Sequence, residues 1–247
     1  MPKSIVIFGF HAIQAQLESN PECLLKVYTL DSRNDKRLNT ISTQLDKLSI
    51  NTQHTTKQQL DKLTKNQTHQ GVVAEILLPT LPNQDGLMQH ITKLEKTALI
   101  LILDSIQDPR NLGACLRSAN AAGVDCVVIN KDGSAPINAL VHKTSAGALN
   151  QLKIFSVTNL ARTIKALKGE DIWVVGLDSS TKTSLYQIDL STSSAIIMGS
   201  EGSGLRPLTK KSCDQLAMIP MQGNVESLNV SVATGIALFE ASRQRLN

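Results

Sequence analysis

Three loops of this sequence carry amide, hydroxyl, carboxylate and guanidinium side chains, and each follows an apolar run typical of a buried strand. Such side chains can orient a polar substrate, and a guanidinium can bind a phosphate through two parallel hydrogen bonds. Because ligands of parallel α/β sheets bind beyond the carboxyl ends of the strands, we expect these loops to form one site. The candidate residues are Asn111, Arg117, Glu201, Ser227 and Asn229.

The first loop, residues 104–119, contains the turn signal Asp108-Pro109, and we expect a helix to begin near Asn111. Arg117 lies six residues further on, off the face that Asn111 occupies, although its long stem could reach the strand ends. A solvated helix arginine is the alternative. A packed stem is favoured because the neighbours are apolar or small, namely Leu116, Ala119, Ala121 and Ala122.

The second loop places Gly199, Gly202 and Gly204 directly after an apolar run. The spacing G-x-x-G-x-G differs from the dinucleotide fingerprint, and no Walker lysine follows, so neither NAD nor a P-loop nucleotide is favoured. Close approach of the backbone to a ligand would explain the glycines. Glu201 needs a partner if it is buried, and the alternative is a solvated turn carboxylate.

The third loop leads from Ile219 and Pro220 into a helix. Leu228, Val232 and Ile236 recur at helical spacing, and Ser227 is the expected N-cap. A helix that begins there directs free backbone N–H groups at whatever lies in front of it. An ordinary strand–loop–helix connection is the alternative.

The strands that precede these loops predict a mainly parallel sheet. Unbroken apolar runs indicate strands buried on both faces, and helical patterns separate most of them. The runs are residues 98–103, 124–129, 172–177, 195–198 and 216–219.

The first 78 residues predict a smaller α/β unit. Helical stripes run through Phe10, Ile13 and Leu17 and, further on, through residues 38–48, while residues 24–30 and 71–78 indicate strands. Prolines, Asn, Asp and Gly gather in residues 79–86. We therefore predict a domain at 1–78, a linker at 79–92 and a second domain at 93–247.

Composition is compatible with a nucleic-acid partner without requiring one. The 247 residues are 41% hydrophobic, which favours packed cores over disorder, and carry a formal charge of +4. Aromatic residues are only 3%, so stacking of bases on several aromatic side chains is not expected.

Other features indicate a cytoplasmic protein without a metal. The four cysteines form no CxxC pair and share no ligand spacing with the five histidines. Residues 1–7 lack the apolar stretch of a signal peptide, and no apolar run approaches the roughly 20 residues of a membrane span. We expect reduced thiols and neither a membrane nor a metal partner.

The three loops together resemble the SpoU (TrmH-like) branch of the SPOUT RNA methyltransferases. Asn111-x-Gly113-x-x-x-Arg117 is similar to that family's first motif, and Gly199-x-Glu201-Gly202-x-Gly204 to its second. Pro220 and the segment Ser227-Leu228-Asn229-Val230-Ser231 are similar to its third. The resemblance spans about residues 98–245, in motif order.

The resemblance implies an S-adenosyl-L-methionine (AdoMet) site in a deep C-terminal trefoil knot, with Gly199, Ile219 and Leu228 contacting AdoMet largely through backbone groups. It also implies a homodimer with sites completed near the subunit interface, and an N-terminal RNA-binding module of the ribosomal-protein type. The expected fold is therefore α/β, a SPOUT domain joined to a small α/β RNA-binding domain.

The expected reaction is methyl transfer to a ribose 2′-hydroxyl. The N-terminal module and the segment Arg243-Gln244-Arg245 are most similar to members that methylate a guanosine of 23S rRNA, free or in an assembly intermediate. In the family, the residue matching Arg117 is assigned as general base, but a guanidinium stays protonated. We therefore expect Arg117 to grip a phosphate, Glu201 to hold Arg117 or a loop amide, and Asn111 and Asn229 to fix the ribose or Arg117. Ser227 would bridge to substrate or to Asn229.

Two alternatives remain. One is a SpoU-type enzyme for tRNA or another rRNA site, and the other is a non-catalytic RNA-binding factor of ribosome assembly.

Overall fold

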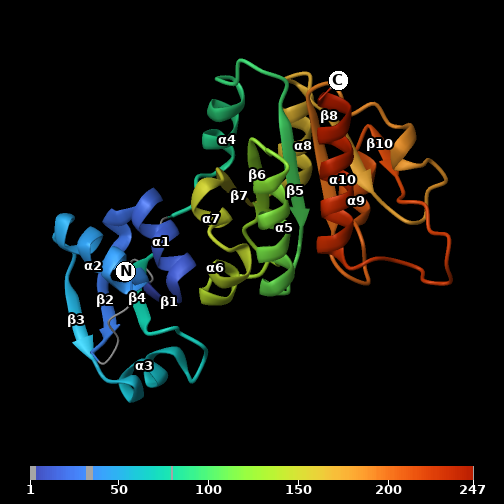
Figure 1. Cartoon of the computed structure of the whole chain (residues 1–247). Helices are drawn as coiled ribbons and strands as arrows, with labels where there is room; N and C mark the ends of the chain where they lie inside the picture. The colour runs from blue at the N-terminus through green and yellow to red at the C-terminus, as the bar shows by residue number, and fades with distance from the viewer. Residues whose placement is uncertain (1–3, 32–35, 79, 247) are drawn as a thin grey trace. The chain divides into compact units, whose positions relative to one another are not determined.

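The computed structural model describes residues 4–31, 36–78 and 80–246 and divides into two compact units. The first contains residues 1–80 and Ile137–Gln151, and the second contains Leu81–Pro136 and Leu152–Asn247. The expected second domain thus includes fifteen residues, 137–151, that pack with the first unit. Figure 1 shows the course of the chain through both units.

The first unit is a four-stranded sheet with helices. Its strands are β1 (Ser4–Phe8), β2 (Leu24–Leu30), β3 (Thr52–Thr55) and β4 (Val72–Leu77), in the order β1-β4-β2-β3. β4 is antiparallel to β1 and to β2, whereas β3 is parallel to β2. The helices are α1 (Phe10–Ser19), α2 (Lys36–Lys47), α3 (Lys57–Thr64), α6 (Ala139–Ser145) and α7 (Ala148–Gln151), with a 3-10 turn, η1, at Pro21–Cys23.

Apolar stripes position the helices of this unit. Ile13 of α1 and Leu45 of α2 are fully buried against Val27 and Val72 of the sheet. The helical stripes and the strands expected at 24–30 and 71–78 are confirmed, except that Leu48 lies exposed beyond the end of α2.

The second unit is a six-stranded sheet in which every pairing is parallel. Its order is β10-β8-β9-β5-β6-β7. The strands are β5 (Leu99–Asp104), β6 (Cys126–Asn130), β7 (Ile154–Val157), β8 (Trp173–Leu177), β9 (Ser194–Gly199) and β10 (Gln215–Ala217). The five strands expected from apolar runs are confirmed, and β7 is an additional one.

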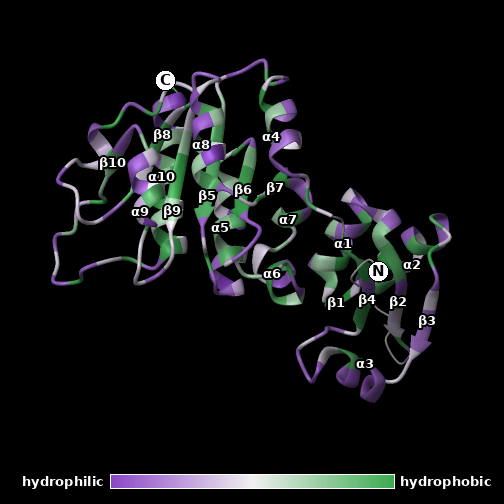
Figure 2. Ribbon diagram, turned by 180° about the vertical axis from the view of Figure 1, so that it is seen from behind, coloured by the Kyte–Doolittle hydropathy of each residue, from purple (hydrophilic) through white to green (hydrophobic). Residues whose placement is uncertain are grey.

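Helices cover both faces of this sheet. They are α4 (Gln84–Ile91), α5 (Pro109–Ala121), α8 (Leu160–Lys168), α9 (Pro207–Ser212) and α10 (Val230–Arg245), with a 3-10 turn, η2, at Leu185–Gln187. α5 and α10 lie side by side over one face (Figure 1), and α8 lies over the other (Figure 2). The green strands between the helices in Figure 2 are the apolar core.

Part of the expected linker is helical. Residues 84–91 form α4, capped by Asn83, whose Oδ1 accepts hydrogen bonds from the backbone N–H groups of Asp85 and Gly86 at 3.1 Å each. Leu87 and Ile91 are buried in the core of the second unit. Across the described ranges, no helix has the length and apolar character needed to cross a bilayer.

Candidate active site

The side chain of Asn229 joins the three candidate loops. Its Nδ2 donates to Asn111 Oδ1 at 3.1 Å and, over a shorter distance, to Glu201 Oε1. Its Oδ1 accepts from the backbone N–H of Ser231 at 2.9 Å and from Ser231 Oγ at 2.6 Å. One amide therefore caps a helix with its oxygen and aligns two other loops with its nitrogen.

This arrangement corrects the expected start of the last helix. Asn229, not Ser227, is the N-cap of α10, and the helix begins at Val230. The core-facing side of α10 also differs from the expected stripe, and Val232 is 51% exposed although the sequence pattern placed it on the apolar stripe. The residues that are buried instead are Val230, Thr234, Ala237, Leu238, Glu240 and Ala241.

Packing between α5 and α10 brings Asn111 opposite Asn229. Further along the two helices, Cys115 Sγ lies 3.4 Å from Thr234 Oγ1, and Ser242 Oγ donates to the backbone carbonyl of Ala122 at 3.0 Å. Burial raises the pKa of the Cys115 thiol to about 11, so this sulfur stays protonated at neutral pH. Cys115 is therefore a packing residue rather than a thiolate nucleophile.

Arg117 stands apart from this network. It is exposed on α5, and its side chain has no hydrogen bond or ion pair to any described residue. The expectation of a packed stem is wrong for this chain, because Cys115, Leu116 and Ala119 take the core-facing side of α5. Its guanidinium is consequently free to bind a group from outside the chain.

Residues 199–205, which we call the glycine loop, fold back on themselves at the end of β9. Ser200 and Gly204 exchange backbone hydrogen bonds at 3.1 and 2.9 Å, and Gly202 and Gly204 have φ angles of 80° and 64°. A Cβ on Gly199 would lie 2.2 Å from the carbonyl carbon of Gly204. The loop's own backbone therefore requires glycine at position 199, whether or not a ligand also approaches it. Glu201, in the same loop, is exposed, yet it is bound by Asn229.

A buried carboxylate closes this loop and was not recognised from the sequence. Asp104 is fully buried at the end of β5, where it pairs with Gly199 across the sheet. Its carboxylate binds Arg206 Nε at 2.7 Å and accepts from the backbone N–H of Arg206 at 3.2 Å. Both ends of the glycine loop are thus tied to one residue. An acidic residue ending an otherwise apolar buried strand was the available signal.

We expect Gly199→Ala to disrupt the glycine loop. Backbone atoms cannot yield like a flexible side chain, so residues 199–205 must move, at a cost of about 1–3 kcal/mol typical of overpacking. Thermal unfolding and a methylation assay would measure the loss of stability and activity. Gly235→Ala on α10 is the matched control, because its Cβ would meet only Ser118 Oγ, at an ordinary contact distance of 3.7 Å. Equal unfolding temperatures and activities for the two variants would contradict the proposed role of this contact.

The loop from Ile219 to Leu228 leaves its backbone groups available. Among the described residues, none of its N–H or C=O groups has a hydrogen-bond partner within the chain. Ile219, Pro220 and Leu228 are half-buried, and Ser227 is exposed without a hydrogen bond to a described residue. Such a segment can offer both apolar contact and backbone hydrogen bonds to a ligand.

Comparison with known proteins identifies the family. Residues 98–239 match the model of the SpoU rRNA methylase family. The chain belongs to the SpoU rRNA methylase family. Residues 6–81 also match the model described as RNA 2′-O ribose methyltransferase substrate binding. As a SpoU family member, the chain has the expected α/β methyltransferase fold joined to a substrate-binding unit, whereas the trefoil knot stays a prediction.

Curated relatives match along nearly the full length. The 23S rRNA (guanosine-2′-O-)-methyltransferase RlmB of Haemophilus ducreyi is 45% identical, over 98% of each chain. The protein of the same name from Vibrio parahaemolyticus is 45% identical, over 97% of each. Among solved structures, the SpoU methyltransferase AviRb from Streptomyces viridochromogenes, in complex with AdoMet, has a TM-score of 0.85 at 22% identity and covers 99% of this chain and 91% of its own, which shows the shared fold.

Proposed function

We propose that this SpoU family chain transfers a methyl group from AdoMet to the ribose 2′-hydroxyl of a guanosine in 23S rRNA. The hydrogen-bonded set of Asn111, Glu201 and Asn229 carries the proposal, because it joins the three loops at the carboxyl end of the sheet. The names of the full-length relatives support guanosine and 23S rRNA as target and substrate.

AdoMet fits the groups that the chain presents. The free backbone N–H and C=O groups of residues 219–228, flanked by Ile219 and Leu228, suit a ligand with a polar base edge and an apolar ring face. We assign Gly199, Ile219 and Leu228 to its binding site. AdoMet supplies a methyl group already activated as a sulfonium, so the protein has to position it and the attacking hydroxyl.

The side chains take distinct roles in this proposal. Arg117 binds a substrate phosphate through its fork of N–H groups, and it does not accept the proton because it remains charged. Asn229 holds Asn111 and Glu201 in place around the ribose. Ser227 bridges to the substrate. A phosphate oxygen of the RNA or another group receives the hydroxyl proton.

Methyl transfer to defined RNAs tests the function. Purified protein would be incubated with labelled AdoMet and with 23S rRNA, 16S rRNA or tRNA transcripts, and modified positions would be mapped by primer extension at low nucleotide concentration. We expect one modified guanosine in 23S rRNA. Modification of tRNA or 16S rRNA alone would favour the other SpoU specificity. An assembly factor would be favoured if the protein binds RNA but transfers no methyl group and shows no AdoMet binding by calorimetry.

We further propose that the protein is a homodimer in the cytoplasm, with residues 1–78 as the RNA-binding domain and residues 93–247 as the methyltransferase domain. An exposed apolar stripe on α10 supports the dimer. Val232 and Phe239, two turns apart, are each 51% exposed, and Ile236 between them is half-buried. Such a stripe is typical of an interaction surface.

We expect Phe239→Asp to convert the dimer to monomers, because it places a charge within the apolar contact between the subunits. Sedimentation velocity would measure the state of association, and the methylation assay its consequence for activity. Leu208→Asp is the control, since Leu208 is an exposed apolar residue on α9 outside the stripe. A Phe239→Asp protein with the sedimentation coefficient of wild type would contradict this interface.

A further inference from the structure

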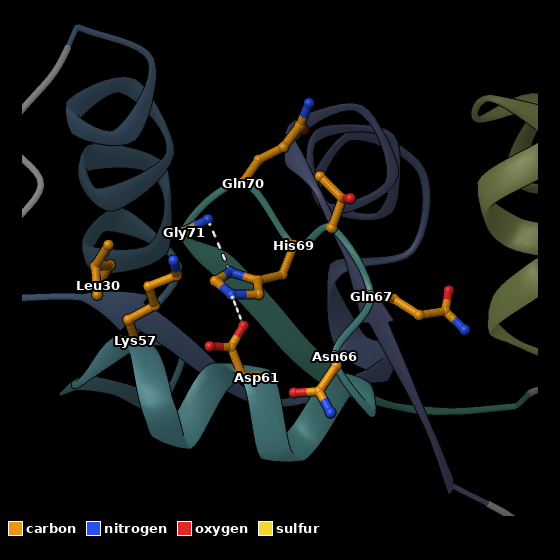
Figure 3. A pocket seen from close by; sticks show the side chains of 9 residues that line it. Leu30, Lys57, Asp61, Asn66, Gln67, His69, Gln70 and Gly71 are labelled. Atoms are coloured by element: carbon orange, nitrogen blue, oxygen red, sulfur yellow. Dashed lines mark hydrogen bonds and ion pairs between the residues drawn. The ribbon is translucent and has the colours of Figure 1, made fainter.

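The first unit contains a cavity of about 390 Å³ between β2, α3 and the turn before β4. Figure 3 shows the residues that line it. Those that carry the argument are Leu30, Lys57, Asp61, Asn66, Gln67 and His69. The volume lies at the lower end for ligand sites, so it suits one small group rather than an extended ligand.

His69 is held rigidly in this cavity by two hydrogen bonds, drawn as dashed lines in Figure 3. Its Nδ1 accepts from the backbone N–H of Gly71 at 3.0 Å, so the ring proton lies on Nε2, which donates to Asp61 Oδ1 at 3.0 Å. His69 is 7% exposed. The carboxylate of Asp61 is therefore fixed in direction, and its Oδ2 has no partner among the described residues.

The turn after α3 adds two side-chain amides to the lining of the cavity, and Figure 3 shows that of Gln67 directed away from Asp61. Lys65 and Asn66 adopt left-handed backbone conformations, with φ of 53° and 60°, and the Asn66 N–H donates to the carbonyl of Asp61 at 2.7 Å. The side-chain amides of Asn66 and Gln67 are exposed and have no partner among the described residues. The turn thus supplies both donors and acceptors at one side of the cavity.

The cavity lining also includes a cationic side chain, that of Lys57. Lys57, the first residue of α3, is exposed, and its ammonium has no hydrogen bond or ion pair with any described residue. Half-buried Leu30 provides an apolar contact. These groups match the parts of a nucleotide. The carboxylate and the two amides suit the edge of a base, the apolar wall suits its face, and the cation suits a phosphate.

We propose that this cavity binds one unstacked ribonucleotide of the RNA substrate, with a base N–H directed at Asp61 and a phosphate at Lys57. The inference rests on the proposed function for its ligand, and the family model described as substrate binding covers all of these residues. Sequence-selective RNA recognition targets splayed-out bases through their edges, which is the contact that Asp61, Asn66 and Gln67 can make.

RNA affinity of the full-length protein tests this site. We expect Lys57→Ala to weaken binding of a 23S rRNA transcript about three- to tenfold and to reduce the slope of log affinity against log salt by about 1. Asp61→Asn should weaken RNA binding about fivefold or more, because a contact to a base is lost. The slope of log affinity against log salt should not change. Lys62→Ala is the matched control, because it removes the same charge from α3 outside the cavity.

These measurements separate a failure of the cavity assignment from a failure of the proposed methyl transfer. Lys57→Ala and Asp61→Asn proteins that bind RNA like Lys62→Ala would overturn the cavity assignment even if methylation is normal. Wild type that binds through the cavity yet transfers no methyl group would instead overturn the proposed reaction. Calorimetry with guanosine 5′-monophosphate separates a free nucleotide from RNA. Mononucleotide binding lost in Lys57→Ala, with RNA affinity unchanged, would overturn RNA as the ligand.

Discussion

Replacing Arg117 with lysine is expected to lower the rate of methyl transfer by about 10²–10³-fold, the cost of one well-placed charge-assisted contact in a transition state. Arg117 is exposed and unpaired within the described chain, so its guanidinium is available to the substrate. Lysine keeps the charge but lacks the planar fork that binds a phosphate through two hydrogen bonds. AdoMet affinity should stay near that of wild type, since no hydrogen bond or ion pair joins Arg117 to the described residues of the glycine loop.

Single-turnover methyl transfer at saturating RNA and AdoMet would measure this effect. Arg162→Lys is the matched control, because Arg162 is likewise exposed but lies on α8, which covers the other face of the sheet. A rate within about threefold of wild type, a difference well under 1 kcal/mol, would remove Arg117 from the active site. The protein should then be tested for a different phosphate-binding residue.

The strands of the second unit were predictable because their environment imposes a simple pattern. Parallel strands are covered on both faces, so β5 is a continuous apolar run up to its last residue, Asp104, and every residue in it is buried. Three strands were missed, and two of them lack this pattern, whereas β1 is apolar after Ser4. β7 has only four residues, and β3, Thr52–Thr55, is a polar strand at the edge of its sheet.

The start of α10 could not be predicted from local propensity. Serine and asparagine are both good N-caps, and Ser227 and Asn229 lie two residues apart. Tertiary contacts decide between them, because an amide can cap the helix with its oxygen and donate to Asn111 and Glu201 with its nitrogen. A hydroxyl has a single proton to donate.

The packing of residues 137–151 with the first unit could also not be predicted from local sequence patterns. α6 packs against β1, and Asn150 Nδ2 donates to Gln16 Oε1 at 3.1 Å, a contact between residues far apart in the sequence. Composition indicated a break at residues 79–86, where the chain does pass between units. The chain enters the first unit again at residue 137 and leaves it at residue 151, and no comparable cluster of Pro and Gly marks both of these positions.

We expect Asn229→Asp to lower the rate of methyl transfer by about 10²-fold at neutral pH, a loss comparable to that of one preorganised donor. Aspartate is as good an N-cap as asparagine, so α10 should keep its start. The two donations from Nδ2 are lost, however, and a carboxylate replaces the amide that bound Glu201. Glu201 should then be repelled from its place beside Asn111.

The pH dependence of this variant separates positioning from folding. Two carboxylates that share a site raise the pKa of one of them, so lowering the pH protonates the pair and restores a donor between residues 201 and 229. We therefore expect the deficit of Asn229→Asp relative to wild type to shrink as the pH falls. Asn159→Asp, which changes the N-cap of α8 in the same way, should leave rate and pH profile unchanged. A deficit in Asn229→Asp that is independent of pH and matched by a lower unfolding temperature would show that Asn229 acts only as a helix cap.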